Sequence, residues 1–331
     1  MNSEQINTSF VHPQLARNTH SVRLLSPHSN KEGLSFRLET FNINHCPEYA
    51  TLSYCWGAQS PPSTITVNGQ SFTNDEEERA DQVQLMRELY TTSSFTIAWL
   101  GSDDGSSSLA LELLTRRKGQ YGKRKQGDRK REVRMEYYET KDLLLKLDGN
   151  PYWKRMWIMQ EFILPPKLLI VCGPTGVWWD DMKRSHGMSN KTCVHMAGLF
   201  ERRNMMHSQT SKFQFVRLLR IAKYRACTRP FDRVFALLGL AMPGDLQGLQ
   251  VDYTMPTQAL YRHVVGLLER VVKSEKEWMR MTKDLAEALE LQPSERALTP
   301  PAWKWPLNMN QDNSDAEKIA STACDGVVLE D

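Results

Sequence analysis

The sequence predicts an α/β protein with a three-layer core, an N-terminal β-hairpin region and C-terminal helical additions. Short β-prone runs alternate with helix-period segments through the middle of the chain, which is the pattern of a sheet with helices packed on it. Two hairpin patterns precede this region, and a long amphipathic stretch follows it. At 331 residues and 40% apolar composition, the chain can bury a substantial core.

The N-terminal region carries two strand pairs in its pattern. Between residues 20 and 45, SVRLLS and LSFRLETFNI are β-prone runs separated by the turn-like PHSNKEG, which predicts a hairpin. Downstream, STITVNGQSF places Asn68-Gly69 between two β-prone triplets. Because a two-residue hairpin turn needs positive φ, this dipeptide predicts a second hairpin there.

The stretch YATLSYCWGAQ lies between these two hairpins. Its β-prone run predicts a buried strand that stops at Trp56-Gly57, where glycine permits a sharp reversal of the backbone. Such a strand delivers the hydroxyl of Ser53, the phenol of Tyr54 and the indole of Trp56 to one loop. The strand end is therefore a candidate for shaping a site.

The middle of the chain alternates helix and strand patterns. ERADQVQLMRELYTT predicts a helix, SFTIAWLG a buried strand closed by Gly101, and SSSLALELLTRR a second helix. Asn150-Pro151 predicts the start of a helix through YWKRMWIMQEFIL, since asparagine caps helices well and proline suits their first position. KLLIVCG predicts the next strand, and VWWDDMKRS a helix beginning near Asp180.

The last third of the chain is predicted to be mostly helical. Residues 185–210 are polar and rich in methionine and show no clear period. SKFQFVRLLRIAKYRA predicts a helix, DRVFALLGLA is an apolar segment, and MPTQALYRHVVGLLERVVKSEKEWMRM has one long helical pattern. Beyond Pro293 the composition predicts a poorly ordered tail.

These patterns divide the chain into a flexible N-terminus over 1–20, one domain over 21–270, and a helical extension with a tail over 271–331. Inside the domain, residues 116–134 form a dense positive run with almost no apolar residues, which favours a mobile surface loop. Nuclear import or nucleic-acid binding through this run is the alternative. Aromatic interleaving is nearly absent, so nucleic acid is not an expected partner.

The composition and the motif content of the sequence argue against several classes of function. Lys and Arg number 42 against 39 Asp and Glu, so no strong overall field draws the chain to nucleic acid or membranes. No secretion signal or membrane span is apparent, and the six cysteines form no C-x-x-C pair, which predicts reduced thiols in the cytoplasm. His186, Cys193, His195 and His207 match no zinc spacing, so no metal is expected. Phosphate-loop, dinucleotide-fold and nucleophile-elbow motifs are absent from the sequence.

Four sequence islands carry the functional information: YATLSYCWG, RMWIMQE, DRVFALLGLA and VDYTMPTQALYR. Together, and in this order, they resemble the fungal heterokaryon-incompatibility (HET) domain over about residues 21–269. The resemblance implies a fungal protein of nonself recognition, also called vegetative incompatibility, that triggers programmed cell death. Its expected partner is a protein of the incompatibility system or a further copy of itself, and its main role is that of a signalling and interaction module.

The chain departs from the family pattern at one place. Family members carry a helix and a strand ending in W-x-D-x-x-C-I-N-Q, whereas here Phe72 leads through TNDEEERAD directly to QVQLM. The departure implies either a gene-model error or a degenerate, inactive HET domain. Because the missing strand belongs beside the one containing Ser53, we expect that strand to lie at a sheet edge.

The HET domain in turn resembles the TIR domain, a flavodoxin-like fold whose enzymatic members cleave NAD. By this resemblance Glu161 corresponds to the catalytic glutamate, and NAD is a candidate substrate rather than a bound cofactor. A carboxylate can stabilise the oxocarbenium-like state of such a cleavage. The residues that would shape the site are Ser53, Tyr54, Trp56, Gly57, Arg155, Trp157, Gln160 and Asp232.

Each of these residues also has a structural interpretation. Glu161 and Arg155 can form an ion pair that ties the helix to neighbouring loops, and Glu161 can also bind a ligand without turnover. Trp56 and Trp157 can be core aromatics, and Asp232 can cap the element that follows it. Enzymatic activity therefore stays open at this stage.

Overall fold

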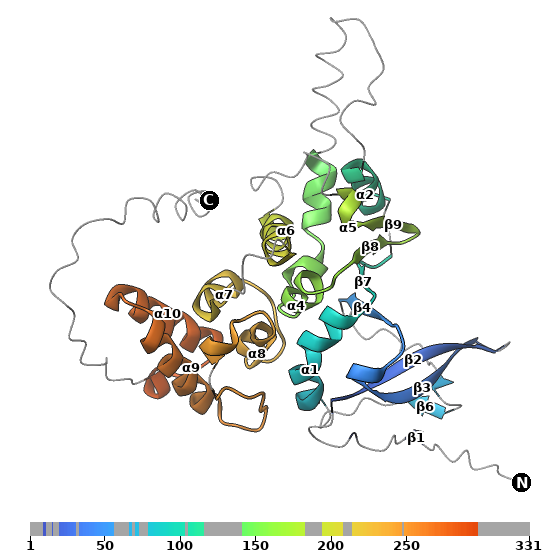
Figure 1. Ribbon diagram of the computed structural model, residues 1–331. Helices are drawn as coiled ribbons and strands as arrows, with labels where there is room; N and C mark the ends of the chain where they lie inside the picture. Colours follow the sequence, from blue (N-terminus) through green and yellow to red (C-terminus); the bar gives the residue numbers. More distant parts are fainter. Residues whose placement is uncertain are drawn as a thin grey trace, which may run out of the picture.

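The computed structural model describes residues 9–10, 15, 20–30, 33–55, 66–67, 70–72, 79–102, 105–115, 141–182, 194–207, 214–246 and 248–296. These residues form a mixed α/β structure with two sheets (Figure 1). The α/β class predicted from the sequence is confirmed. The basic run at 116–134 and the tail beyond 296 lie outside the described residues.

The N-terminal sheet is built from the two predicted hairpins. Its long ribbon pairs β2 (Ser21–Asn30) with β3 (Gly33–Asn42) in antiparallel register from Ser21↔Asn42 to Asn30↔Gly33. The second hairpin pairs β5 (Thr66–Val67) with β6 (Gln70–Phe72), and β1 (Ser9–Phe10) joins β6 in parallel. The strand order is β1-β6-β5-β3-β2. Both predicted strand pairs are confirmed, while the Asn68-Gly69 turn lies outside the described residues.

The central sheet contains the three strands predicted from apolar runs. β4 (Ala50–Tyr54), β7 (Phe95–Trp99) and β8 (Leu168–Cys172) are parallel, and β9 (Thr175–Trp178) pairs antiparallel with β8. The order β4-β7-β8-β9 leaves β4 as an outer strand of this sheet within the described part of the chain. This is the edge position expected for the strand that contains Ser53.

Helices pack on one face of the central sheet. α1 (Arg79–Thr92) connects β4 to β7, and α2 (Ser107–Thr115), helical residues 141–148, η2 (Pro151–Lys154) and α4 (Ile158–Ile163) lie between β7 and β8. Along each strand the side chains of this face are buried, among them Ala98, Ile170 and Val177. Of the three layers expected, the described residues form the sheet and this one helical layer.

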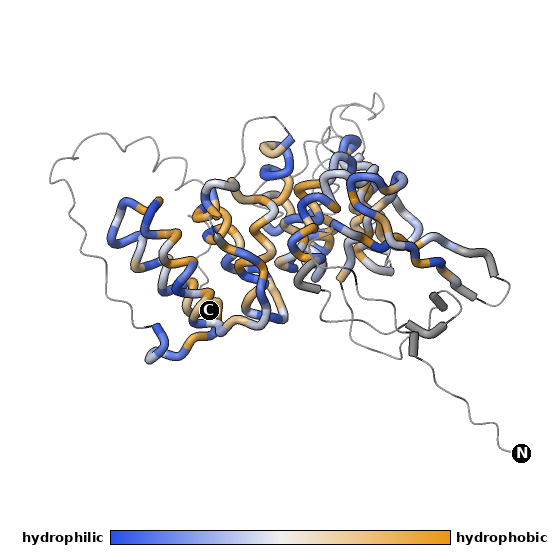
Figure 2. The backbone as a smooth tube through the Cα atoms, turned by 60° about the horizontal axis from the view of Figure 1, so that its bottom comes forward, coloured by the Kyte–Doolittle hydropathy of each residue, from blue (hydrophilic) through white to orange (hydrophobic). Residues whose placement is uncertain are grey.

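The C-terminal part is a set of packed helices. α5 (Trp179–Met182), α6 (Val194–His207), α7 (Phe215–Ala222) and α8 (Asp232–Leu238) continue the core, followed by η3 (Pro243–Leu246), α9 (Thr257–Val271), α10 (Glu275–Ala288) and η4 (Pro293–Arg296). Figure 2 shows α9 and α10, at the left, alternating between hydrophobic and hydrophilic segments as amphipathic helices do.

Several predicted boundaries are wrong for identifiable reasons. The helix expected from Asn150 breaks after η2, because Arg155 is extended and the amide of Met156 donates to the carbonyl of Ala226 at 2.8 Å. The single long C-terminal helix is two helices, since Val272 is extended and the Ser274 side chain caps α10. The local sequence pattern indicates neither the hydrogen bond to Ala226 nor the break in the helix at Val272.

Two elements of the fold were not predicted from the sequence. Thr175–Trp178 form β9, for which no strand was predicted, and the region with no clear period contains α6. The helix expected near Asp180 is confirmed as α5. The buried stripe of α6 includes Met196, Leu199 and Arg203, so an arginine occupies a position where an apolar residue would have completed the pattern. The start of α6 is capped by Asp148, whose carboxylate accepts from the amide of Met196 at 2.8 Å.

Candidate functional site

The centre of the candidate site is a contact between β4 and α4. Ser53, 1% exposed, points from β4 toward the helical face, and its hydroxyl donates to Oε2 of Glu161 at 2.5 Å. Glu161 lies in the first turn of α4, where a negative side chain is favoured by the helix dipole. The sheet and the helix are thus joined by a buried, charge-assisted hydrogen bond.

Arg155 supplies the counter-charge for Glu161. Its Nη1 lies 3.0 Å from Oε2 and its Nη2 lies 3.4 Å from Oε1, and both side chains are largely buried, at 18% and 8% exposure. Burial lowers the pKa of Arg155, but the charge and hydrogen bonds of Glu161 outweigh it and raise the pKa above its ordinary value. The pair predicted from the six-residue spacing is therefore formed. The chain achieves it through the break between η2 and α4 rather than along one helix.

Tyr152 is the fourth member of a buried cluster that also contains Ser53, Arg155 and Glu161. Its hydroxyl lies 2.8 Å from Oγ of Ser53. Because the one hydroxyl proton of Ser53 goes to Glu161, Tyr152 is the donor in this contact. Burial, and next the charge of Glu161, raise the pKa of Tyr152 well above its ordinary value, which keeps the phenol protonated and able to donate.

Gln160 connects the same helix to the DRVFALLGLA segment. Its Nε2 donates to the carbonyl of Ala236 in α8 at 3.1 Å. Gly239 ends α8 so close to this side chain that a Cβ there would lie 2.1 Å from Oε1 of Gln160. Arg87 of α1 donates to the carbonyl of Gly239. A Cβ at this position would therefore force the buried side chain of Gln160 to shift.

Asp232 connects that segment to the VDY element. It is the first residue of α8, is 2% exposed, and accepts a hydrogen bond from the hydroxyl of Tyr253 at 2.7 Å. The guanidinium of Arg229 lies 5.6 Å from the centre of the Tyr253 ring. All four sequence islands are thus joined by contacts that run from Ser53 through Glu161, Gln160 and α8 to Tyr253.

The other predicted site residues lie around this network. Tyr54 points to the opposite face of β4, where its ring centre is 6.5 Å from that of Trp99. Trp157 is half-buried against the core just before α4, and its carbonyl accepts from the amide of Glu161 at 3.3 Å. Trp56 and Gly57 lie outside the described residues.

Sequence reasoning missed Tyr152 and Arg203. Tyr152 is 0% exposed and lies beside the capping pair Asn150-Pro151, so its position next to a good cap was the available signal. Arg203 is buried and donates to the carbonyl of Phe162 at 2.8 Å, at the end of α4. Burial lowers its pKa to about 10. No local pattern in the polar stretch around Arg203 indicates this role.

The histidines considered as metal ligands make other contacts. His195 pairs with Asp148 at 3.0 Å, and the Nε2 of His207 lies 3.0 Å from the carbonyl oxygen of Ile163. They lie near opposite ends of α6, roughly 18 Å apart by helix rise, so they cannot share an ion. His186 and Cys193 lie outside the described residues.

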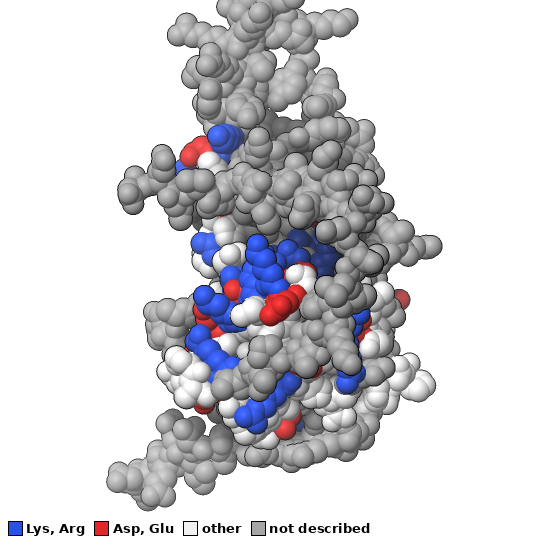
Figure 3. Space-filling model, turned by 90° about the vertical axis from the view of Figure 1, so that its left-hand side faces the viewer, with Lys and Arg blue, Asp and Glu red and all other residues white. Residues whose placement is uncertain are grey.

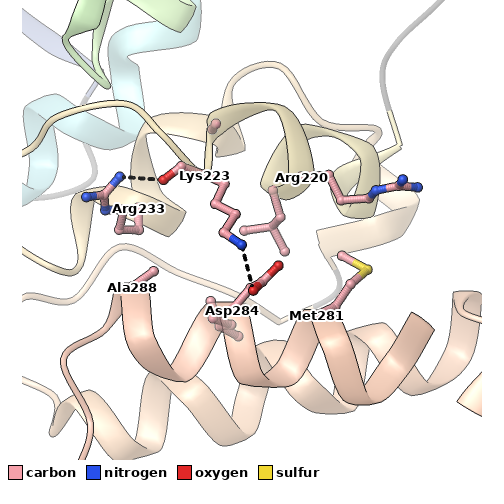
Figure 4. Close-up of a pocket in the computed structure, with 9 residues that line it drawn as sticks. Arg220, Lys223, Arg233, Met281, Asp284 and Ala288 are labelled. Atoms are coloured by element: carbon pink, nitrogen blue, oxygen red, sulfur yellow. Dashed lines mark hydrogen bonds and ion pairs between the residues drawn. The ribbon is translucent and has the colours of Figure 1, made fainter. Parts of the chain in front are cut away.

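A small pocket lies away from the cluster, between α7, α8 and α10 (Figure 4). It has a volume of about 40 Å³ and is lined mainly by apolar side chains together with Lys223 and Asp284, which pair at 2.8 Å. Ligand sites for molecules of drug size or larger occupy roughly 300 Å³ or more. This pocket is therefore too small for a dinucleotide.

The side of the molecule that contains α10 is rich in cations (Figure 3). Two helices on this side carry exposed basic side chains. They are Arg217 and Arg220 on α7, and Lys276, Arg280 and Lys283 on α10. Some charges are balanced locally, since Arg220 pairs with Glu277 at 3.1 Å. In the described part of the chain, no helix is long and apolar enough to cross a membrane.

The fold and the site define an α/β protein whose parallel sheet is tied to its helices by a buried ion pair. Residues 72–161, from the end of β6 to Glu161, match the family described as "Heterokaryon incompatibility protein (HET)". The chain is also 23% identical to "Heterokaryon incompatibility protein 6, OR allele" of Neurospora crassa, over 72% of this chain and 50% of that protein. The chain is therefore similar to heterokaryon-incompatibility proteins, and its match to the family lies in residues 72–161.

The chain spans about half the length of the curated relative that it matches. No solved structure matches it. The resemblance to TIR domains accordingly depends on the sequence motifs alone.

Proposed function

We propose that this protein acts in fungal vegetative incompatibility, in the cytoplasm, as a signalling and interaction module whose engagement triggers programmed cell death. The family match and the named relative support the incompatibility role. The module role is supported by one observation at the site. Both carboxylate oxygens of Glu161 are engaged, by Ser53 and Arg155, in a position with 8% side-chain exposure.

A carboxylate held in this way performs a structural task. It joins β4 to α4 and compensates the charge of Arg155, which burial would otherwise penalise. To grip the ribose hydroxyls of NAD, the same oxygens would have to leave these partners. The geometry therefore favours a scaffold over a catalyst.

The second candidate is an NAD glycohydrolase that uses Glu161. One observation favours it: Glu161 meets β4 at Ser53, the fourth of five residues, near the carboxyl end of a parallel strand. In open α/β sheets, ligands bind beyond such ends. In this candidate, Glu161 would stabilise the oxocarbenium-like state formed when the bond to nicotinamide breaks. A degenerate HET domain without activity is the remaining alternative.

The discriminating experiment expresses the chain from an inducible promoter in a fungal host and measures viability and cellular NAD together. Glu161→Gln is compared with Ser53→Ala, which leaves the ion pair intact, and with Glu277→Gln, which removes one charge from a surface pair. Soluble yield and thermal melting of each purified variant show whether it folds.

The module predicts cell death with unchanged NAD, and death that survives every variant that folds. A fall in NAD that Glu161→Gln abolishes and Glu277→Gln does not would establish the enzyme instead. The same comparison is made with purified protein and NAD at high protein concentration. Absence of both death and turnover from the wild-type chain would indicate the degenerate domain.

A further inference from the structure

Three arginine side chains from different elements lie close enough together for their charges to interact. Arg202 belongs to α6, Arg217 to α7, and Arg225 to the turn that follows α7. Burial lowers the pKa of Arg202 and that of Arg225, the latter to about 10. The charge of Arg217 further lowers the pKa of Arg202, and the charge of Arg202 further lowers that of Arg225. We call these three side chains the arginine cluster.

The fold holds two of the three guanidinium groups in place through backbone contacts. The Nη1 of Arg225 donates to the carbonyl of Trp153 at 2.7 Å. Arg202 lies back along α6, where its Nη1 donates to the carbonyl of Gly198. Gly198 leaves room for this arrangement, since a Cβ there would lie 2.8 Å from that Nη1. The two side chains are therefore positioned by hydrogen bonds and packing, and not by carboxylates.

The arginine cluster carries an excess of positive charge. In the part of the chain that the structure describes, none of its three members forms an ion pair. Glu201 raises the pKa of Arg202, but Glu201 is exposed, and adjacent residues on a helix point in different directions. Because a charge taken out of water without a counter-charge is costly, buried charges are normally paired. A bound anion would supply the missing counter-charge.

The arginine cluster also has unused hydrogen-bond donors. A guanidinium presents several N–H donors in a planar fork. Arg202 and Arg225 each donate through Nη1, while their Nε atoms are buried and have no partner among the described residues. Arg217 is exposed, and its side chain makes no hydrogen bond within the same residues. Donors of this geometry match the oxygens of phosphate, which arginine binds in a bidentate manner.

We propose that the arginine cluster binds the phosphate group of a small, soluble phosphorylated molecule. A phosphate monoester carries a charge of about −1.5 to −2 at pH 7 and three acceptor oxygens, so one group can serve all three arginines. Arg202 and Arg225 are half-buried, which favours a small ligand over the broad surface of a nucleic acid or a membrane. This site goes beyond the proposed function, because neither the module role nor NAD cleavage requires it.

The test is isothermal titration calorimetry of the purified full chain with inorganic phosphate, at constant ionic strength maintained with sodium chloride. We expect binding with a Kd on the order of 1 mM. Arg217→Gln should weaken it at least fivefold, and it should fold normally because this side chain is exposed. Gly198→Ala should weaken it as well, since the added Cβ displaces Arg202 without changing the charge.

Arg280→Gln is the matched control. Arg280 is also exposed, and it lies on α10 instead of beside the cluster, so its loss should leave phosphate binding unchanged. A second arm measures sedimentation of the chain with vesicles of phosphatidylcholine that contain a phosphatidylinositol phosphate. We expect no more binding to these vesicles than to phosphatidylcholine alone.

Four outcomes would overturn the proposal. The first is no heat of binding with phosphate up to about 20 mM, well above the expected Kd. Equal weakening by Arg217→Gln and Arg280→Gln would show a general effect of net charge, and binding unaffected by both Arg217→Gln and Gly198→Ala would place the phosphate elsewhere. Binding to the vesicles alone would assign the site to a lipid headgroup. These measurements involve neither NAD nor cell death, so their failure is distinct from a failure of the proposed function.

Discussion

The Arg155–Glu161 pair should couple far more strongly than a surface pair of the same length. At 3.0 Å and an effective dielectric constant of about 20, the attraction is about 5 kcal/mol before desolvation is subtracted. Arg155→Met leaves a buried carboxylate without its counter-charge, which typically costs about 3–5 kcal/mol. Glu161→Gln should cost a similar amount, while the double variant should cost much less than their sum.

We expect a coupling of about 2–3 kcal/mol from this double-mutant cycle. The assay is urea unfolding of the four proteins at pH 7, followed by far-ultraviolet circular dichroism. Lys223 and Asp284 provide the matched control, because they pair at 2.8 Å with side chains 36% and 29% exposed. Their coupling should stay below about 1 kcal/mol. Equal coupling in the two cycles would refute the argument from burial.

Three further predictions follow from other contacts of the network. Gly239→Ala should lower the free energy of unfolding in urea by about 1–2 kcal/mol, because its Cβ meets Gln160. Gly266→Ala is the control, because the space around Gly266 is open and the change should be neutral or stabilising. A Gly239→Ala variant as stable as the wild type would contradict the close approach. Burial raises the pKa of Tyr152, so the stability that its protonated phenol contributes is complete below about pH 10 and is lost as pH rises further. The urea midpoint of Tyr152→Phe should therefore fall less steeply above about pH 10 than that of the wild type. Equal slopes of midpoint against pH in the two proteins would contradict this prediction. Tyr253→Phe should lower the unfolding free energy by about 1.5–3 kcal/mol, because it removes a hydrogen bond to a buried aspartate; an unchanged thermal midpoint would show that water replaces the hydroxyl.

The sequence predicted most strands of this fold because apolar runs and turn dipeptides are local signals. It placed β4, β7 and β8 correctly, and β4 has the expected edge position among the strands that the structure describes. It failed where distant groups decide the local structure. The break before α4 depends on a bridge to Ala226, and the start of α6 depends on Asp148, which is remote in sequence.

The candidate site was predictable in part. The spacing of Arg155 and Glu161 suggested their ion pair, but only the fold shows that Ser53 shares the same carboxylate. The capping pair beside Tyr152 marks the start of its helical turn, but the contact of its hydroxyl with Ser53 on β4 depends on the fold. Residue types alone do not determine which polar groups meet in the interior.

The distance along the chain between the partners of the buried cluster has a consequence for biosynthesis. Ser53 and Glu161 are 108 residues apart, and Gln160 is a further 76 residues from its partner in α8. At about 5–20 residues per second, a ribosome takes roughly 5–20 s to supply Glu161 after Ser53. During this interval β4 can pair with β7, but Ser53 lacks its partner Glu161 and the sheet lacks β8. The nascent chain should therefore depend on chaperones until α8 has emerged, and production of this protein should be most sensitive to temperature at that stage.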